Sequence, residues 1–223
     1  MHASNDWLVW QLADSAFPNG GFAHSGGLEA AWQQGAVSDK SELTAFIRAA
    51  LGQAAQYQIP FLNTVYHDPS AFEVVDRHCD CYLRNHVARR GSLKQGSTLL
   101  SAAVYAFGGT SLVTLRRRLV KRKRHAHLPV VFGLVARELA IGHSQSVRLF
   151  LFLTLRDLNS AAVRLGVVGP HGAQSIQHRT APYVDRIAQQ CQGYTLDDIA
   201  QSSPIIDILH GNHDRLYSRL FQT

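Results

Sequence analysis

Residues 12–29 read LADSAFPNGGFAHSGGLE, which is an apolar helix end, then a turn, then a new helix behind paired glycines. Pro18 lacks a backbone N–H and biases Phe17 away from helical dihedrals, and the Asn-Gly-Gly at 19–21 admits positive φ. The chain must therefore reverse or kink here. Ordering so much glycine costs conformational entropy, which indicates that the polar side chains of this glycine turn have a role. They are Asp14, Ser15, His24 and Ser25.

Outside the glycine turn, apolar residues recur at helical spacing. Asp39 and Glu42 have capping-box spacing, and the residues that follow place Leu43, Phe46, Ile47, Ala50, Leu51 and Ala54 on one helical face. Similar patterns predict helices from about residue 6 to Pro18, from about Ser25, from Pro60, from Ser70 with Glu73, over 85–107, 129–139, 145–165 and 176–190, from Leu196 behind Thr195, and from Pro204. No stretch alternates like a strand for long. We therefore predict an all-α fold, a single-domain bundle of about ten helices over residues 1–223.

Composition agrees with a globular chain. Of the 223 residues, 46% are hydrophobic and only 17% are charged, so many helix faces must be buried, some of them between molecules. Three cysteines, an odd number without framework spacing, favour a reducing compartment and a cytoplasmic protein. We expect no signal peptide and no membrane-spanning segment.

The net charge of +6 comes largely from residues 116–127, which we expect to form a basic surface loop. Its cations are Arg116, Arg117, Arg118, Lys121, Arg122, Lys123 and Arg124. One alternative function is nucleic-acid binding through this run. Because no stacking aromatic residues or reading helix accompany it, a solvated loop is the simpler interpretation, and an acidic protein surface fits as well as phosphate.

Two further sets of residues suggest chemistry. Asp14, His24 and Ser25 have the residue types of a small hydrolase or metalloenzyme, but no strand precedes the serine and no Gly-x-Ser-x-Gly elbow is present. Cys79 and Cys81 are two apart on a predicted helix, so they point away from each other and cannot share one metal ion.

The last two candidate regions lie in the second half of the chain. A predicted helix carries polar Arg156, Asp157, Asn159, Ser160 and Arg164. The spacing puts Arg156, Asn159 and Ser160 on one face, which is either exposed to solvent or engaged by a partner. The closing segment, residues 203–223, ends on apolar anchors and is therefore expected to dock. In it His210 and His213 are one helical turn apart and could share a metal ion, although Gly211 weakens that helix.

Four stretches, in the same order and spacing, resemble the urease accessory protein UreF family. They are residues 12–29, NHVARRGSLKQG at 85–96, RDLNSAAVRLGVVGP at 156–170, and SPIIDI through YSRLF at 203–221. Two features depart from the family pattern: His86 stands where an acidic residue is common, and the basic run is denser. Asn212 stands beside His213 where some relatives carry cysteine, so a thiolate nickel site is unsupported.

The resemblance implies a dimerising, non-enzymatic scaffold. It would bind UreD (also called UreH) and recruit the GTPase UreG to apo-urease for nickel insertion, with an influence on GTP hydrolysis. No tightly bound cofactor, nucleic acid or membrane is implied, and nickel contact would be transient, at His24, His210 and His213. By matching positions, the implied partner-binding or structural residues are Asp14, His24, Ser25 and Glu29 in the glycine turn, Arg89 in the second stretch, Arg156, Ser160 and Arg164 on the central helix, and Tyr217, Arg219 and Phe221 in the tail.

Overall fold

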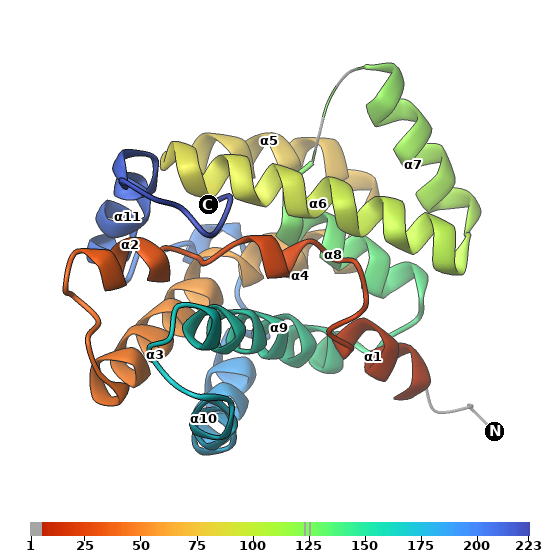
Figure 1. Ribbon diagram of the computed structural model, residues 1–223. Coiled ribbons are helices and arrows are strands. Elements are labelled where there is room, and N and C mark those ends of the chain that lie inside the picture. Colours follow the sequence, from red (N-terminus) through yellow and green to blue (C-terminus); the bar gives the residue numbers. More distant parts are fainter. Residues whose placement is uncertain (1–5, 123, 125) are drawn as a thin grey trace.

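The computed structural model describes residues 6–122, 124 and 126–223, and it confirms the all-α prediction: the described residues form helices and connections, without strands. The α-helices are α1 (Asp6–Ala13), α2 (Leu28–Gln33), α3 (Lys40–Tyr57), α4 (Ile59–His67), α5 (Phe72–Tyr82), α6 (His86–Phe107), α7 (Thr110–Lys121), α8 (Leu128–Glu138), α9 (His143–Arg164), α10 (Pro170–Cys191) and α11 (Pro204–Gly211) (Figure 1). Short 3-10 helices are η1 (Gly21–Ala23), η2 (Pro69–Ala71), η3 (Leu196–Asp198) and η4 (Asn212–Arg215).

Two helices, α3 and α6, begin directly after the residues whose side chains cap them. The Asp39 side chain accepts hydrogen bonds from the backbone N–H groups of Ser41 and Glu42, and Asn85 does the same for Val87 and Ala88. These bonds satisfy N–H groups that have no partner within the helix, so α3 and α6 begin as the sequence indicates.

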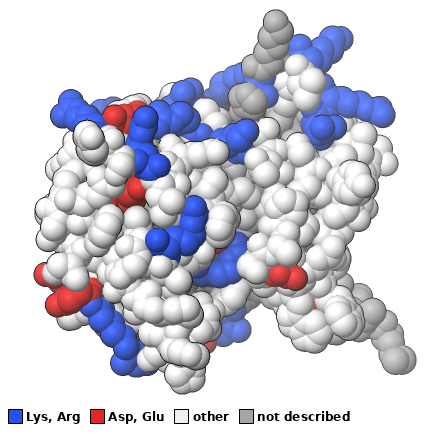
Figure 2. Space-filling view, in the orientation of Figure 1, with Lys and Arg blue, Asp and Glu red and all other residues white. Residues whose placement is uncertain are grey.

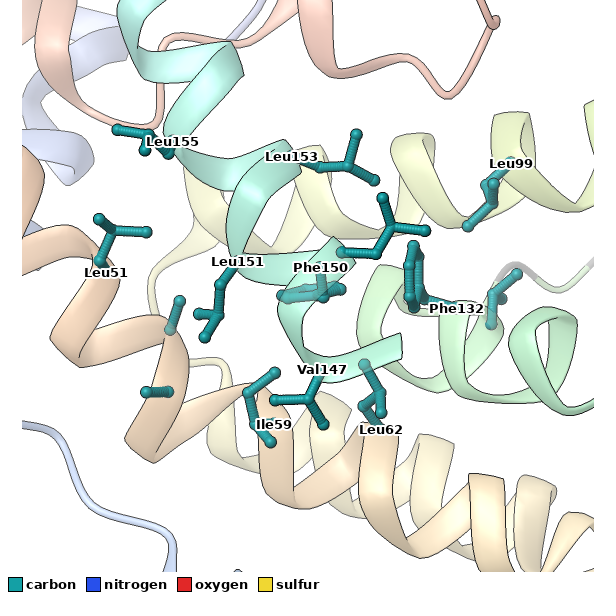
Figure 3. Packing of buried hydrophobic residues seen from close by; sticks show 14 of the residues in the cluster. Leu51, Ile59, Leu62, Leu99, Phe132, Val147, Phe150, Leu151, Leu153 and Leu155 are labelled. Atoms are coloured by element: carbon teal, nitrogen blue, oxygen red, sulfur yellow. The ribbon is translucent and has the colours of Figure 1, made fainter. Parts of the chain in front are cut away.

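The core is organised around α9, which packs against α3, α4, α8 and α10. Figure 3 shows Val147, Phe150 and Leu151 of α9 among side chains from α3, α4 and α8. Phe132 and Phe150 meet edge to face with ring centroids 5.2 Å apart. Because α9 is apolar around most of its circumference, its remaining polar positions stand out as candidates for a role other than packing.

Two helix pairs approach so closely that only glycine fits at the crossing. A Cβ atom at Gly133 of α8 would lie 2.5 Å from the carbonyl oxygen of Leu62 in α4. A Cβ at Gly96 of α6 would overlap the carbonyl oxygen of Ala126. These contacts fix α8 between α4 and α6, and α6 in turn carries the groups that hold the closing segment.

Several local predictions were wrong. The basic run is not a loop from its start: residues 116–121 are the second half of α7, because Leu112 and Leu115 bury one face of that helix. Lys123 lies outside the described residues. The helix expected from Ser25 begins at Leu28. Ser70 lies in η2 instead of capping α5, and the helix expected from Leu196 is only the 3-10 turn η3.

Among the described residues, none of the helices has both the length and the apolarity that crossing a bilayer requires.

Candidate functional site

The glycine turn is held in shape by its own polar groups. The Asp14 carboxylate accepts a hydrogen bond from the backbone N–H of Ala16 at 2.8 Å, and the Asn19 side-chain oxygen accepts one from Gly21 at 2.9 Å. Gly20 has φ of 85° and Gly27 has φ of 90°, in the region that favours glycine. The predicted kink is therefore confirmed, with positive φ at Gly20 but not at Gly21.

The closing segment docks onto this turn, so two regions far apart in the chain form one site. In Figure 1 the dark blue end of the chain lies beside the orange glycine turn and the start of α6. The backbone N–H of Ser25 donates to the carbonyl oxygen of Thr223 at 2.7 Å, and Gln222 donates to Ala23 at 2.8 Å. The His24 Nδ1 and the Thr223 hydroxyl are 2.5 Å apart.

Glu29 is the centre of this contact. Its side chain is 1% exposed, and its Oε2 lies 3.0 Å from the Nε2 of His213, which is completely buried. The same carboxylate accepts hydrogen bonds from the backbone N–H groups of Leu220 at 2.6 Å and Phe221 at 3.2 Å. A buried carboxylate is stable only when it is paired and hydrogen-bonded, and here the closing segment supplies all three partners.

The polar strip of α9 supports the turn from the other side. Arg156 donates from Nη1 to the carbonyl oxygens of Ala13 at 2.9 Å and Asp14 at 3.1 Å. The guanidinium of Arg164 donates to the Phe22 carbonyl oxygen and lies 4.1 Å from the ring centroids of both Phe22 and Phe221. Arg164 thus joins the turn to the closing segment by a hydrogen bond and two cation–π contacts.

Asp157 lies directly under the turn. Its carboxylate accepts two hydrogen bonds from Arg156, at 2.7 and 3.0 Å. A Cβ atom at Gly21 would overlap that carboxylate, so only glycine allows the turn to lie this close to α9. Burial raises the pKa of Asp157, and the positive charge of Arg156 opposes that shift.

Two histidines at the contact between the glycine turn and the closing segment are held neutral. Burial lowers the pKa of His24 to about 4, with further lowering from Lys94, Arg90 and His213. Burial lowers the pKa of His210 to about 3, with contributions from His213 and His24. The three predicted nickel histidines are therefore close enough for their charges to interact. Both His210 and His213 are buried.

A cavity of about 210 Å³ adjoins the site and is lined from the glycine turn, α3, α6, α9 and α11. Three of its lining residues have a buried polar atom that finds no hydrogen-bond partner among the described residues: Gln53 Oε1, Tyr57 OH and His210 Nε2. Buried polar atoms are normally satisfied, so these atoms favour a polar occupant such as water or an ion. Exposed Arg84 and Gln201 also line the cavity, which connects it to solvent.

Comparison with known proteins identifies the family of the chain. A family model described as UreF matches residues 37–181, more than half of the chain. The chain belongs to the UreF family. It is 36% identical over 228 residues to the urease accessory protein F of Oryza sativa subsp. indica, covering all of this chain and 87% of the relative.

Two further UreF relatives come from another plant and from a bacterium. The urease accessory protein F of Arabidopsis thaliana is 36% identical over 219 residues, which cover 96% of this chain and 91% of the relative. The urease accessory protein UreF of Arthrobacter sp. (strain FB24) is 27% identical over 213 residues, with 96% and 95% covered. The alignment with the Oryza sativa relative covers all of this chain, so the similarity extends beyond the residues that the UreF family model matches and includes the glycine turn and the closing segment.

The structure assembles no catalytic triad from the glycine-turn residues of this UreF-family chain. The Ser25 hydroxyl donates to the Thr223 carbonyl, His24 contacts the Thr223 hydroxyl, and the exposed Asp14 carboxylate holds its own turn. No group of three or more His, Cys, Asp or Glu side chains is placed to hold a metal ion within the residues the structure describes. Cys79 is buried and Cys81 exposed, as expected for opposite faces of a helix.

Other predicted site residues lie in different places. Arg89 pairs with Asp80 of α5 at 2.7 and 3.1 Å and does not contact the turn. Ser160 is half-buried on α9 between Arg156 and Arg164. In the closing segment Phe221 is buried and Tyr217 is exposed. The Arg219 guanidinium lies 3.5 Å from the Asp214 carboxylate.

Sequence reasoning missed two contributors to the site, Thr223 and Arg90, and it placed Asp157 in the polar set of the central helix without making it a site residue. Thr223 closes the turn, and Asp157 lies beneath it. Arg90 of α6 forms a two-point ion pair with Asp214, at 2.7 and 3.0 Å, and this pair holds the pKa of Asp214 well below its usual range. One clue to the Thr223 contact was present in the sequence, because Gly91 is a glycine within a predicted helix, and such a glycine often marks a close contact. In the structure a Cβ at Gly91 would lie 2.8 Å from the Thr223 hydroxyl.

Proposed function

We propose that this chain is a non-enzymatic urease maturation factor that, with UreD (UreH), recruits the GTPase UreG to apo-urease for nickel insertion. Membership of the UreF family and relatives named urease accessory proteins support a role in urease maturation. The observation that carries the proposal for a partner is the two-sided closing segment. Its inner side is buried on the glycine turn, whereas its outer side carries exposed Ile205, Ile208, Tyr217 and Leu220.

Such a surface suits protein recognition. Apolar and aromatic side chains that a chain leaves exposed on an ordered segment are typical of an interface core, and charged residues are depleted there. The inner contacts to Glu29 and Ser25 hold the segment in one conformation, so binding does not have to order it. UreD (UreH) is the partner that we assign to this outer side.

The test is a pull-down of UreD (UreH) and UreG with the full chain and two variants. Ile208→Glu and Tyr217→Ala change only the outer side, and we expect each to lower recovery of UreD (UreH). Val74→Glu is the matched control, because Val74 is an exposed apolar residue on α5. Equal recovery with all three variants, or no complex with the unaltered chain, contradicts the proposal.

An influence on the GTPase is a separate part of the proposal. If the chain regulates UreG through the assembled complex, the GTP hydrolysis rate of UreG should change when this chain and UreD (UreH) are added together. Ile208→Glu should reduce the change, since it weakens assembly. A rate that is the same with and without the chain leaves recruitment as its only role.

Nickel is the cargo in this proposal, and its contact with the chain is transient. The free Nε2 of His210 and Nδ1 of His213 are buried without hydrogen-bond partners among the described residues, and neutral imidazole is the form that ligates metals. Together with His24 they would offer nitrogen ligands when the closing segment moves. Equilibrium dialysis with Ni²⁺ tests this: His210→Ala and His213→Ala should weaken uptake, whereas exposed His171→Ala should not.

We also propose a homodimer that acts in the cytoplasm. Trp7 and Trp10 of α1 are exposed and pack edge to face, with ring centroids 5.3 Å apart, which leaves a large aromatic surface uncovered in one chain. The free thiols of the three cysteines are consistent with a reducing compartment. Light scattering of the purified chain tests the dimer, and a monomer at micromolar concentration contradicts it.

A further inference from the structure

The basic residues of α7 form a surface that the site described above does not use. Between Asp80 and Glu138 the sequence contains no Asp or Glu. The described cations on and after α7 are Arg116, Arg117, Arg118, Lys121, Arg122 and Arg124. Figure 1 shows α7 rising away from the body of the molecule, and in Figure 2 blue side chains gather over it at the upper right, with no red among them in that view.

The positive charge of α7 is neutralised only on the side that faces Glu73. Glu73 of α5 pairs with Arg118 at 3.3 Å and with Arg122 at 3.1 Å. Within the described part of the chain Arg116, Arg117, Lys121 and Arg124 have no ion pair. Arg117 and Lys121 are one helical turn apart, and like charges at that spacing destabilise a helix. The folded chain thus carries an electrostatic cost on this side that an acidic partner would remove.

A groove lies between α6 and α7, and neither Arg118 nor Arg122, the two partners of Glu73, lines it. The half-buried Asp76 carboxyl interacts with the charge of Arg124, which does line it. Its volume is about 390 Å³, its floor includes Leu100, Leu119, Ala126 and Val131, and Arg116 and Arg124 also line it. The Nε of Arg116 lies 3.4 Å from the Ser101 hydroxyl, which keeps its guanidinium beside the groove. Val120, exposed, lies in the same lining. The groove therefore combines an apolar floor with positive charge.

We propose that this groove binds an acidic protein segment that inserts one apolar side chain between α6 and α7. The carboxylates of the segment would pair with Arg116, Arg117 and Arg124, and the apolar side chain would cover Leu100 and Val131. Nucleic acid fits less well, because no aromatic side chain lines the groove for stacking and an apolar floor gives nothing to a phosphate backbone. This inference does not rest on the proposed function.

Fluorescence anisotropy with the full chain tests the proposal. The probe is a fluorescein-labelled peptide of Asp and Glu residues around one central Leu. The comparison probes are the same peptide with Ser in place of Leu, and an oligothymidylate of equal charge. We expect the Leu peptide to bind about tenfold more tightly than the Ser peptide, since one buried Leu contributes that much, and more tightly than the oligothymidylate.

Variants separate the groove from general charge attraction. Arg116→Glu and Arg124→Glu should each weaken Leu-peptide binding about tenfold, as expected for charges beside a binding groove. Ser97→Trp fills the groove and should abolish the preference for Leu. If circular dichroism shows that Ser97→Trp does not fold, it is replaced by Val120→Asp, which changes the exposed edge of the groove. Arg179→Glu on α10 is the matched control, because Arg179 is equally exposed and distant from α7.

Three results would overturn the proposal. One is equal binding of the Leu and Ser peptides, which would show attraction by charge without the groove. Another is oligothymidylate binding that is as tight as the Leu peptide's and equally sensitive to Arg116→Glu, which would favour nucleic acid. The third is a loss with Arg179→Glu as large as that with Arg116→Glu.

Discussion

Glu29 and His213 face each other in the interior, with 3.0 Å between Oε2 and Nε2, although one belongs to the glycine turn and the other to the closing segment. Removing the carboxylate in Glu29→Ala would leave His213 and the Phe221 N–H buried without an acceptor, and would also remove the acceptor of the part-buried Leu220 N–H. We expect a loss of about 3 kcal/mol in the free energy of unfolding, typical of breaking a buried hydrogen-bonded pair. Urea denaturation measures it.

The same variant should free the closing segment locally before the whole chain unfolds. Amide hydrogen exchange at Leu220 and Phe221 should speed up far more than exchange in α9. Glu138→Ala, at an exposed carboxylate on α8, is the control and should change neither quantity. Unchanged exchange at the closing segment in Glu29→Ala would mean that other contacts, such as that of Arg164, hold it.

Gly21→Ala tests the close approach of the turn to α9. The added methyl group would overlap the Asp157 carboxylate, so either the turn or the Arg156–Asp157 pair must shift. We expect a loss of about 2 kcal/mol in stability, in the range of overpacked sites. Gly193→Ala is the matched control, since nothing lies within 4 Å of its added Cβ. A stable Gly21→Ala chain would show that Asp157 moves aside at little cost.

Stability should fall as the solution becomes acidic. The pKa of His24 is lowered to about 4 and that of His210 to about 3, from 6.5 in the unfolded chain, so both are neutral in the fold. Below pH 6.5 the unfolded chain binds protons that the folded chain does not, and the stability that is fully present above pH 6.5 is lost toward pH 4. Each histidine contributes a slope of up to about 1.4 kcal/mol per pH unit.

Urea titrations at a series of pH values check this slope. Between pH 6.5 and 4, His24→Ala should lower the slope of stability against pH by the amount that corresponds to about one bound proton, whatever its effect on stability at neutral pH. Exposed His171→Ala should leave the dependence as it is. An identical slope in His24→Ala and the unaltered chain would show that His24 takes up its proton in the folded state.

Thiol labelling should distinguish the three cysteines. Cys81 is exposed, whereas Cys79 and Cys191 are buried, and burial raises the pKa of both buried thiols, that of Cys191 to about 12. We expect a thiol reagent to modify one cysteine quickly in the native chain and all three in urea. Cys81→Ser should remove the fast phase, whereas Cys79→Ser should leave it. Two fast-reacting thiols would contradict the helical placement of this pair.

Sequence patterns that depend only on residues close together in the chain predicted the local structure correctly. The Asp39 cap, the Asn85 cap and the turn at Pro18 depend on neighbours in sequence, so their spacing was sufficient. The loop predicted at residues 116–127 followed from the density of arginines there, although Leu112, Leu115 and Leu119 recur at helical spacing. The burial of Leu112 and Leu115 outweighs the mutual repulsion of those arginines.

The candidate site was only half predictable, because its partners are far apart in the chain. The polar residues of the glycine turn stood out, and the closing segment was expected to dock. Nothing in the spacing indicated that one would dock on the other. Glu29 meets Leu220, and His24 meets Thr223, across most of the chain's length, and only the packing of α6 and α9 brings them together.

The docking of the closing segment on the glycine turn also orders events during biosynthesis. Ser25 and Glu29 leave the ribosome early, yet the groups that hydrogen-bond to them, from His213 to Thr223, are translated only after α3 to α10. While α3 to α10 fold, water must solvate the Glu29 carboxylate. The nascent chain therefore holds an open turn next to a formed bundle, and a factor present at that stage meets a surface that the finished protein has covered.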